Sequence, residues 1–286
     1  MVKKAVILCG GLGTRFLPYT KSIPKEMIPI LDKPILQILL EELKDAGIEK
    51  VLIILGRNKE CIQNHFDRNI ELEAALKNKA DLYEKARGTE NIVDIFYKRC
   101  SEPKGTAYAL NCAKDFVRND TFLMLFGDEL MKSEISVIKQ LLRAYKKCKN
   151  NLISVQKVDK KEVHKYGIIQ PLDLGGGLYK VIDFVEKPKE SEAPSNISYL
   201  GAAVLRKEIF EEIQKIEPDK NGCYNLPDAF KELIKQDNMY ACEITGERFD
   251  TGNKFGFVKA NIAYGLADAD INTQLKEYII SLLKDF

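Results

Sequence analysis

Short apolar runs alternate with amphipathic segments along the first half of the chain. Each apolar run predicts a buried strand, and each segment with apolar residues three or four positions apart predicts a helix. The predicted strands cover residues 3–9, 51–55, 92–97, 121–126 and 151–158, and predicted helices follow Pro34, Pro103 and Ile135. This alternation predicts an α/β fold, with a mostly parallel sheet and helices on both of its faces.

The second half of the chain is richer in strand signals. We expect strands over residues 168–169, 178–185 and 199–205, and helices over residues 207–213, 226–235, 255–267 and 271–284. The last helix has an apolar stripe, formed by Leu275, Tyr278, Ile279 and Leu282. We expect this stripe to pack on the chain's own core, with docking on a partner subunit as the alternative.

Residues 67–90 interrupt the alternation of strand and helix. The segment is charged and helix-prone, with a few apolar residues on one side. Two interpretations remain open. The favoured one is a solvated helical insertion, and the other is a mobile flap over a binding site.

A glycine-rich turn follows the first predicted strand and indicates a polyphosphate site. The turn reads Gly10-Gly11-Leu12-Gly13-Thr14-Arg15, and Lys25 follows ten residues later. Glycines let backbone N–H groups approach phosphate oxygens, and the arginine fork suits phosphate. The chain has no P-loop, and Phe16 replaces the third glycine of the dinucleotide fingerprint, which disfavours an NAD-dependent oxidoreductase.

Two separate aspartates are candidate ligands for Mg²⁺. Asp128 follows an apolar strand and Gly127, and ligands of open α/β sheets bind at such strand ends. Carboxylates together with phosphate oxygens suit Mg²⁺. The alternative role for Asp128 is to stabilise a turn. Asp250 precedes Gly252 at the start of a predicted helix, where it either caps the helix or provides a second carboxylate to the same ion.

The end of the strand over residues 178–185 carries two charged residues before Pro188. Lys187 offers a point charge to a single phosphate, and Glu186 can accept hydrogen bonds from sugar hydroxyls. Successive side chains of a strand face opposite sides, so at most one enters a cleft unless the strand twists or bulges there. An exposed, charged strand end is the alternative interpretation.

Composition excludes several classes of protein. The 286 residues are 45% hydrophobic and 30% charged, as in ordinary globular proteins. The net charge of +2 and the dispersed Lys and Arg residues argue against nucleic-acid binding. No apolar run approaches the roughly 18 residues of a membrane span. Seven cysteines without a C-x-x-C pair argue against a disulfide scaffold or structural zinc, and fit a reducing, cytoplasmic location.

The order of the motifs resembles the sugar-1-phosphate nucleotidyltransferases, and within them the bacterial UTP–glucose-1-phosphate uridylyltransferases. The motifs are G-G-x-G-T-R, P-K-E, K-G near 105, G-D near 128, Y-G at 166–167, E-K-P, A-P-S-N and D-T-G-N, and they extend from about Val2 to about Gly265. The resemblance implies a Rossmann-like mixed, mostly parallel central sheet flanked by helices, with a smaller β-rich sugar-binding portion and a C-terminal helix. It implies one domain over residues 1–286, with a nucleotide-binding half (1–158), a sugar-phosphate-binding half (159–268) and the helix (269–286).

The resemblance also implies roles for the matching residues. The nucleotide phosphates are bound by Arg15 and Lys25, and the nucleoside by Gly10, Gly11, Glu26 and the segment around Gly105. The sugar phosphate is bound by Gly167, Glu186 and Lys187, and Mg²⁺ by Asp128 and Asp250. The chain departs from the family at Cys100, where a glutamine usually reads the uracil edge, since a thiol is a poor hydrogen-bonding substitute. Residues 223–228 depart from the family as well.

The implied reaction converts UTP and glucose 1-phosphate into UDP-glucose and pyrophosphate, with Mg²⁺ as cofactor. The phosphate nucleophile is ionised at pH 7, so catalysis needs positioning and charge neutralisation rather than a general base. One alternative is a relative that makes a dTDP-, CDP- or ADP-sugar. Another is a non-catalytic, sugar-nucleotide-binding regulatory protein on the same fold. We further expect a homodimer or homotetramer.

Overall fold

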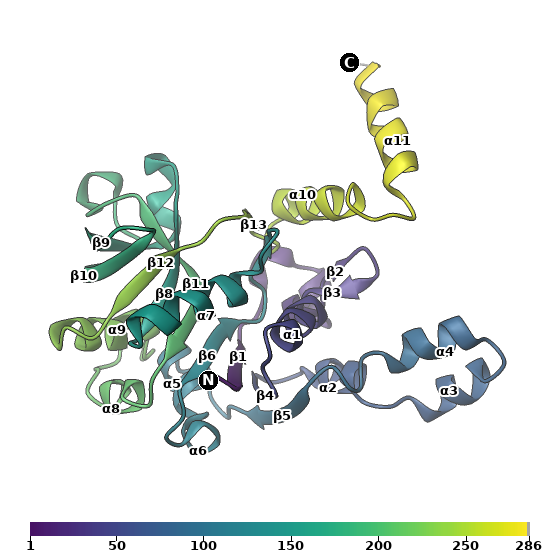
Figure 1. Cartoon of the computed structure of the whole chain (residues 1–286). Helices are drawn as coiled ribbons and strands as arrows, with labels where there is room; N and C mark the ends of the chain where they lie inside the picture. Colours follow the sequence, from purple (N-terminus) through teal and green to yellow (C-terminus); the bar gives the residue numbers. More distant parts are fainter. Residues whose placement is uncertain (285–286) are drawn as a thin grey trace.

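A nine-stranded mixed sheet forms the centre of the computed structural model, which describes residues 1–284 (Figure 1). From one edge to the other, its strands are β5 (Asp94–Arg99), β4 (Lys50–Leu55), β1 (Lys4–Cys9), β6 (Phe122–Phe126), β11 (Ile197–Leu205), β8 (Leu152–Lys157), β12 (Tyr240–Glu243), β10 (Leu178–Glu186) and β9 (Gly167–Asp173). Strands β5, β4, β1 and β6 pair in parallel, whereas β10 and β11 run against their neighbours. The predicted mixed α/β sheet is confirmed, but it is not mostly parallel, because the strands contributed by the second half of the chain add mainly antiparallel pairs.

Each face of the sheet buries its own core, because successive strand side chains point to opposite faces. Val6 of β1 belongs to the core on one face and Ile7 to the core on the other. The first core is covered by α5 (Thr106–Asn111), α6 (Lys114–Val117), α8 (Ile209–Ile213) and α9 (Leu226–Lys235). The second is covered by α1 (Ile35–Asp45), α2 (Glu60–Phe66) and α7 (Val137–Cys148). Helices on both faces were predicted from the alternation of elements.

Two short strands, β7 (Leu130–Lys132) and β13 (Glu247–Phe249), pair outside the main sheet. The pairing is antiparallel, and Leu130 lies opposite Phe249. Asp128 precedes the start of β7, and Asp250 follows the end of β13. The pairing therefore brings these two aspartates, far apart in sequence, to the same end of the small sheet. Beside it, α10 (Lys254–Gly265) packs on β2 (Pro29–Ile30), which pairs with β3 (Lys33–Pro34).

The last helix, α11 (Asn272–Lys284), does not pack on the core, so that expectation was wrong. In Figure 1 it projects away from the body of the protein beyond α10. None of its described residues is buried, and Tyr278 and Leu283 are 61% and 69% exposed. An apolar stripe on a helix indicates that some surface covers it, but does not indicate whether that surface is the chain's own core or another subunit. Within residues 1–284, no helix is long and apolar enough to cross a membrane.

Residues 67–90 form a helical hairpin, as the favoured interpretation predicted. Its helices are α3 (Ile70–Leu76) and α4 (Ala80–Arg87), which pack on each other beyond edge strand β5 (Figure 1). Arg68 holds the base of the hairpin through an ion pair with Glu73 at 2.6 Å. No residue of the segment lines either of the two cavities described below, so its position does not support a flap.

Candidate active site

Two cavities lie on either side of a common wall at the carboxyl end of β6. The first has a volume of about 550 Å³ and is lined by the turn after β1, the end of β4, residues 100–106 and the end of β6. The second, of about 540 Å³, is lined by residues 165–167, the end of β10 and residues 225–228. Both cavities share the side chains of Thr106, Phe126, Glu129 and Asn225. Ligands in the two cavities would therefore meet at this wall.

The first cavity contains most of the residues predicted to bind the nucleotide. Its lining includes Gly10, Gly11, Lys25, Cys100, Gly105 and Asp128. At Gly105 the backbone has φ +95°, and an added Cβ would collide with the backbone of Tyr224. That backbone is fixed by two hydrogen bonds, from Tyr224 N to the Lys104 carbonyl (2.8 Å) and from Ala107 N to the Tyr224 carbonyl (3.0 Å). Only glycine fits this part of the wall.

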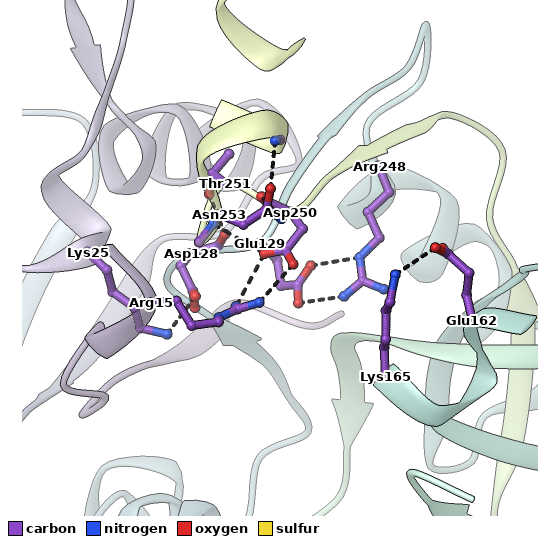
Figure 2. Close-up of polar contacts among 12 residues, drawn as sticks. Arg15, Lys25, Asp128, Glu129, Glu162, Lys165, Arg248, Asp250, Thr251 and Asn253 are labelled. Atoms are coloured by element: carbon purple, nitrogen blue, oxygen red, sulfur yellow. Dashed lines mark hydrogen bonds and ion pairs between the residues drawn. The ribbon is translucent and has the colours of Figure 1, made fainter. Parts of the chain in front are cut away.

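The predicted basic and acidic residues contact each other as two separate ion pairs (Figure 2). Lys25 Nζ lies 2.5 Å from Asp128 Oδ2, and Arg15 donates two hydrogen bonds to Asp250, at 2.9 and 3.2 Å. Burial would lower the pKa of Lys25, but the charges of Asp128 and Glu26 raise it above its ordinary value. Burial would raise the pKa of Asp250, but Arg15 lowers it. Neither Arg15 nor Asp250 lines a cavity.

Glu26 was predicted to bind the nucleoside, but the structure places it outside both cavities. Its side chain is completely buried and lines neither cavity. Both of its carboxylate oxygens accept hydrogen bonds from Lys59 Nζ, at 2.8 and 2.7 Å. It packs against Gly127, where an added Cβ would lie 3.0 Å from Glu26 Cγ. Glu26 thus supports the floor behind Asp128, and Lys59, which the sequence did not single out, is its partner.

Cys100 is buried in the wall of the first cavity and is 8% exposed. Its sulfur lies 2.7 Å from Sγ of Cys112, the residue that ends α5. Burial, reinforced by Cys112, raises the pKa of the Cys100 thiol to about 12. At neutral pH this side chain is an uncharged thiol, and it can offer a ligand only a weak hydrogen bond.

The second cavity contains the residues predicted to bind the sugar phosphate. Gly167, Glu186 and Lys187 all contribute to its lining. Lys187 has φ +49°, so the chain leaves the extended conformation at this residue and the alternation of sides ends. This is why both charged side chains line one cavity. Lys187 N donates a hydrogen bond to the Tyr166 carbonyl (3.0 Å), which joins the two segments of the wall.

Glu129 and Arg248 had no predicted role, but the structure places both beside the second cavity. Arg248 donates from Nε and Nη2 to the two oxygens of Glu129, at 3.1 and 2.8 Å (Figure 2). Burial raises the pKa of Glu129, and the charge of Arg248 offsets only part of this effect. The residues adjoin the predicted ligands, since Glu129 follows Asp128 and Arg248 lies two positions before Asp250. That adjacency is the signal that could have identified them.

A glycine turn after the first strand, two cavities with a common wall and paired carboxylates beside that wall are the features of a nucleotidyltransferase. The chain belongs to the nucleotidyl transferase family, whose model matches residues 4–265. Among its relatives is UTP–glucose-1-phosphate uridylyltransferase 2 of Staphylococcus saprophyticus, 44% identical over 98% of both chains. The UTP–glucose-1-phosphate uridylyltransferase of Staphylococcus epidermidis is 43% identical, again over 98% of both chains.

Solved structures with a similar fold include several UDP-glucose pyrophosphorylases. The UDP-glucose pyrophosphorylase of Acinetobacter baumannii superposes with a TM-score of 0.91 at 34% identity, covering 99% of this chain and 100% of that one. The UTP-bound form of that enzyme gives a TM-score of 0.90 at 34% identity and the same coverage. A UDP-glucose pyrophosphorylase complexed with UDP-glucose gives 0.84 at 35% identity, over 92% of this chain and 98% of that one.

Proposed function

We propose that this chain transfers the uridylyl group of UTP to glucose 1-phosphate, producing UDP-glucose and pyrophosphate. The observation that carries the proposal is the pair of cavities that meet at Glu129, with Asp128 and Lys25 in the first and Lys187 in the second. A nucleotide and a sugar phosphate can each occupy one cavity and place their phosphates at the common wall. The relatives named for this reaction, aligned over nearly the whole chain, support the choice of substrates.

In this proposal UTP occupies the first cavity. Its base lies toward Cys100 and Gly105, and its phosphates lie along the turn at Gly10 and Gly11, near Lys25. Because Lys25 and Arg15 are bound to carboxylates, the incoming phosphates compete with those carboxylates for them. A lysine or arginine that moves from a carboxylate to a phosphate keeps an anionic partner throughout. Its positive charge is therefore never left unpaired during the exchange.

Glucose 1-phosphate occupies the second cavity. Glu186 accepts hydrogen bonds from sugar hydroxyls, Lys187 binds the phosphate, and the backbone at Gly167 allows the sugar to approach closely. A phosphate oxygen then attacks the α-phosphorus of UTP, and the bond from that phosphorus to pyrophosphate breaks. The nucleophile is already ionised at neutral pH, so the protein's task is to hold two anions in line and reduce their repulsion.

We propose that Asp128 and Asp250 hold Mg²⁺ when substrates are bound. The donor set fits, because carboxylate oxygens beside phosphate oxygens are what Mg²⁺ prefers, and both carboxylates are compensated by positive side chains in this structure. The bound ion would neutralise phosphate charge. Arg15 and Lys25 would then be free to turn toward the phosphates.

Three further expectations belong to this proposal. Residues 1–158 provide most of the first cavity and residues 159–268 most of the second, which supports a nucleotide-binding and a sugar-phosphate-binding half within one domain. The exposed apolar side chains of α11 favour a homodimer or homotetramer, in which a second copy covers that helix. Buried free thiols such as Cys9 fit a reducing, cytoplasmic location.

The test is pyrophosphate release from a matrix of nucleoside triphosphates and sugar 1-phosphates, with Mg²⁺ and with a chelator. The proposal predicts the highest kcat/KM for UTP with glucose 1-phosphate, and none of this turnover with chelator. A higher kcat/KM with dTTP, CTP or ATP would reassign the base and locate its determinant at Cys100. Tight binding of UTP without turnover of any pair would indicate the non-catalytic, regulatory protein instead.

A further inference from the structure

The Glu129–Arg248 pair stands in the wall between the two cavities and is shielded from solvent. Only 28% of the Glu129 side chain and 16% of the Arg248 side chain are exposed. The two parallel hydrogen bonds fix the orientation of both groups, because the planar guanidinium matches the carboxylate. Glu129 lines both cavities, whereas Arg248 lines only the second.

Neighbouring residues hold the pair on its other sides. At Gly201 of β11, an added Cβ would lie 3.0 Å from Glu129 Cγ, so this strand packs closely on the glutamate. The Arg248 guanidinium lies over the ring of Tyr166, 4.7 Å from its centroid. Tyr166 is the residue that precedes Gly167 and accepts the hydrogen bond of Lys187 N. The pair thus connects the residue after Asp128 with the segments that line the second cavity.

The charge of Glu129 is unfavourable for the proposed reaction. Its carboxylate lies where two anionic substrates would meet, and Glu129 directly follows Asp128, which carries a second carboxyl group. Without a partner, this carboxylate would repel the phosphate entering the second cavity. Arg248 supplies the compensating charge, and its two hydrogen bonds keep the carboxylate oxygens engaged.

We infer that Arg248 is a positioning residue that acts through Glu129, neutralising and holding this carboxylate so that the sugar phosphate can enter the second cavity. The inference rests on the proposed function and names a further residue that it depends on. It requires no contact between Arg248 and substrate. When Arg248 is lost, the unpaired Glu129 carboxylate weakens binding of the sugar phosphate. Removing that carboxylate as well should restore the binding.

Four variants test this inference: Arg248→Gln, Arg248→Lys, Glu129→Gln and the double variant Glu129→Gln/Arg248→Gln. Two quantities are measured, the KM for glucose 1-phosphate and its dissociation constant by calorimetry, which needs no turnover. Arg248→Gln should raise both by about tenfold, the order expected for one uncompensated charge near a phosphate, with a smaller change in the KM for UTP. Arg248→Lys keeps the charge but loses the paired hydrogen bonds, so it should raise both quantities less than Arg248→Gln does. Glu129→Gln should also raise them less than Arg248→Gln, and the double variant should recover most of the loss.

The matched control is Arg206→Gln, which breaks a similar ion pair with Glu208 (3.1 Å) away from both cavities and should change neither quantity. An unchanged dissociation constant in Arg248→Gln, or a double variant as impaired as Arg248→Gln, would overturn the inference. If Arg248→Gln does not fold, Glu129→Gln and the double variant decide: a tenfold rise of the dissociation constant in both overturns the inference, and a clearly smaller rise in both upholds it. Absence of turnover in the wild type would instead refute the proposed function, because the calorimetric comparison remains valid without it.

Discussion

The hydroxyl of Thr251 donates a hydrogen bond to the backbone carbonyl of Asp128, at 3.2 Å, across a separation of 123 residues. Thr251 is 1% exposed and directly follows Asp250. Together with the pairing of β7 and β13, this bond fixes the loops of both aspartates next to each other before any ligand is bound. In the proposed function these two carboxylates share one cation, which requires that they be held near each other, since like charges otherwise separate.

Thr251→Val should lower both stability and turnover. Valine has nearly the same shape as threonine but leaves the Asp128 carbonyl without this donor, which costs about 1 kcal/mol of unfolding free energy. Turnover should fall and the Mg²⁺ concentration for half-maximal activity should rise, because the two carboxylates are less well fixed. Urea denaturation and a Mg²⁺ titration measure the two effects. Thr251→Ser, which keeps the hydroxyl, is the control, and equal losses in both variants would exclude the hydrogen bond as the cause.

Lys187→Ala should raise the KM for glucose 1-phosphate by about tenfold or more and change the KM for UTP much less. Lys187 lines only the second cavity, and its side chain has one weak partner, Glu186 Oε1 at 3.4 Å. Steady-state kinetics with each substrate varied in turn provide the measurement. Lys189→Ala, two positions further and 82% exposed in its side chain, is the control. An equal rise in both Michaelis constants would remove Lys187 from the sugar-phosphate site.

Lys59→Met should destabilise the protein by about 3–5 kcal/mol, because it leaves the buried Glu26 carboxylate without its partner. The side chains of Lys59 and Glu26 are 6% and 0% exposed. The double variant Glu26→Gln/Lys59→Met should regain part of this loss, since no charge then remains buried. By contrast, Lys3→Met at the exposed Lys3–Glu49 pair should cost less than about 1 kcal/mol. Similar losses at both sites, measured by urea unfolding, would contradict the assignment.

Glu42→Gln should stabilise the protein at alkaline pH but not in acid. Burial raises the pKa of Glu42 to about 7. The charge of Lys139 opposes this rise, and the charge of Asp45 adds to it. The folded protein therefore retains a proton that the unfolded chain, with a pKa of about 4.3, has lost, and stability falls as the pH rises between these values. At pH 8 the variant should be more stable by about 1–2 kcal/mol, because part of the carboxyl remains solvated. A constant difference between pH 4 and pH 8 would refute this pKa.

The sequence predicted the elements that have strong local patterns. The apolar runs of β1 and β6 and the glycine turn between residues 10 and 15 are signals within a few residues, and the structure has them at the predicted places. The carboxylates at 128 and 250 were predicted to share one site, and the β7–β13 pairing brings their loops to the same end of the small sheet. Contacts between side chains far apart in the sequence could not be predicted from such local patterns. Nothing in the sequence around Glu26 indicates Lys59 as its partner.

One error and one point that the sequence left open have distinct physical causes. The stripe of α11 indicated an apolar face but could not indicate which surface covers it. In the structure Leu275 lies beside Gly265 of α10, whereas Tyr278 and Leu282 stay exposed. At Glu186 and Lys187 the alternation of strand side chains predicted that at most one enters the cleft unless the strand twists or bulges there. The left-handed backbone of Lys187 ends that alternation directly after Glu186, the last residue of β10, so both residues line the second cavity. Such a conformation is rare outside glycine, and no local pattern around Lys187 indicates it.

The most direct test of the central claim is the formation of UDP-glucose by wild-type protein and by Asp128→Asn, followed by ³¹P NMR with UTP, glucose 1-phosphate and Mg²⁺. The control is Asp120→Asn, which breaks only the Lys4–Asp120 pair, whose aspartate side chain is 58% exposed. We expect wild type and control to release one pyrophosphate per UDP-glucose, and Asp128→Asn to be slower by about 10²–10³-fold while remaining folded. UDP-glucose formation by folded Asp128→Asn at the wild-type rate would contradict the claim that the two substrates meet at this carboxylate.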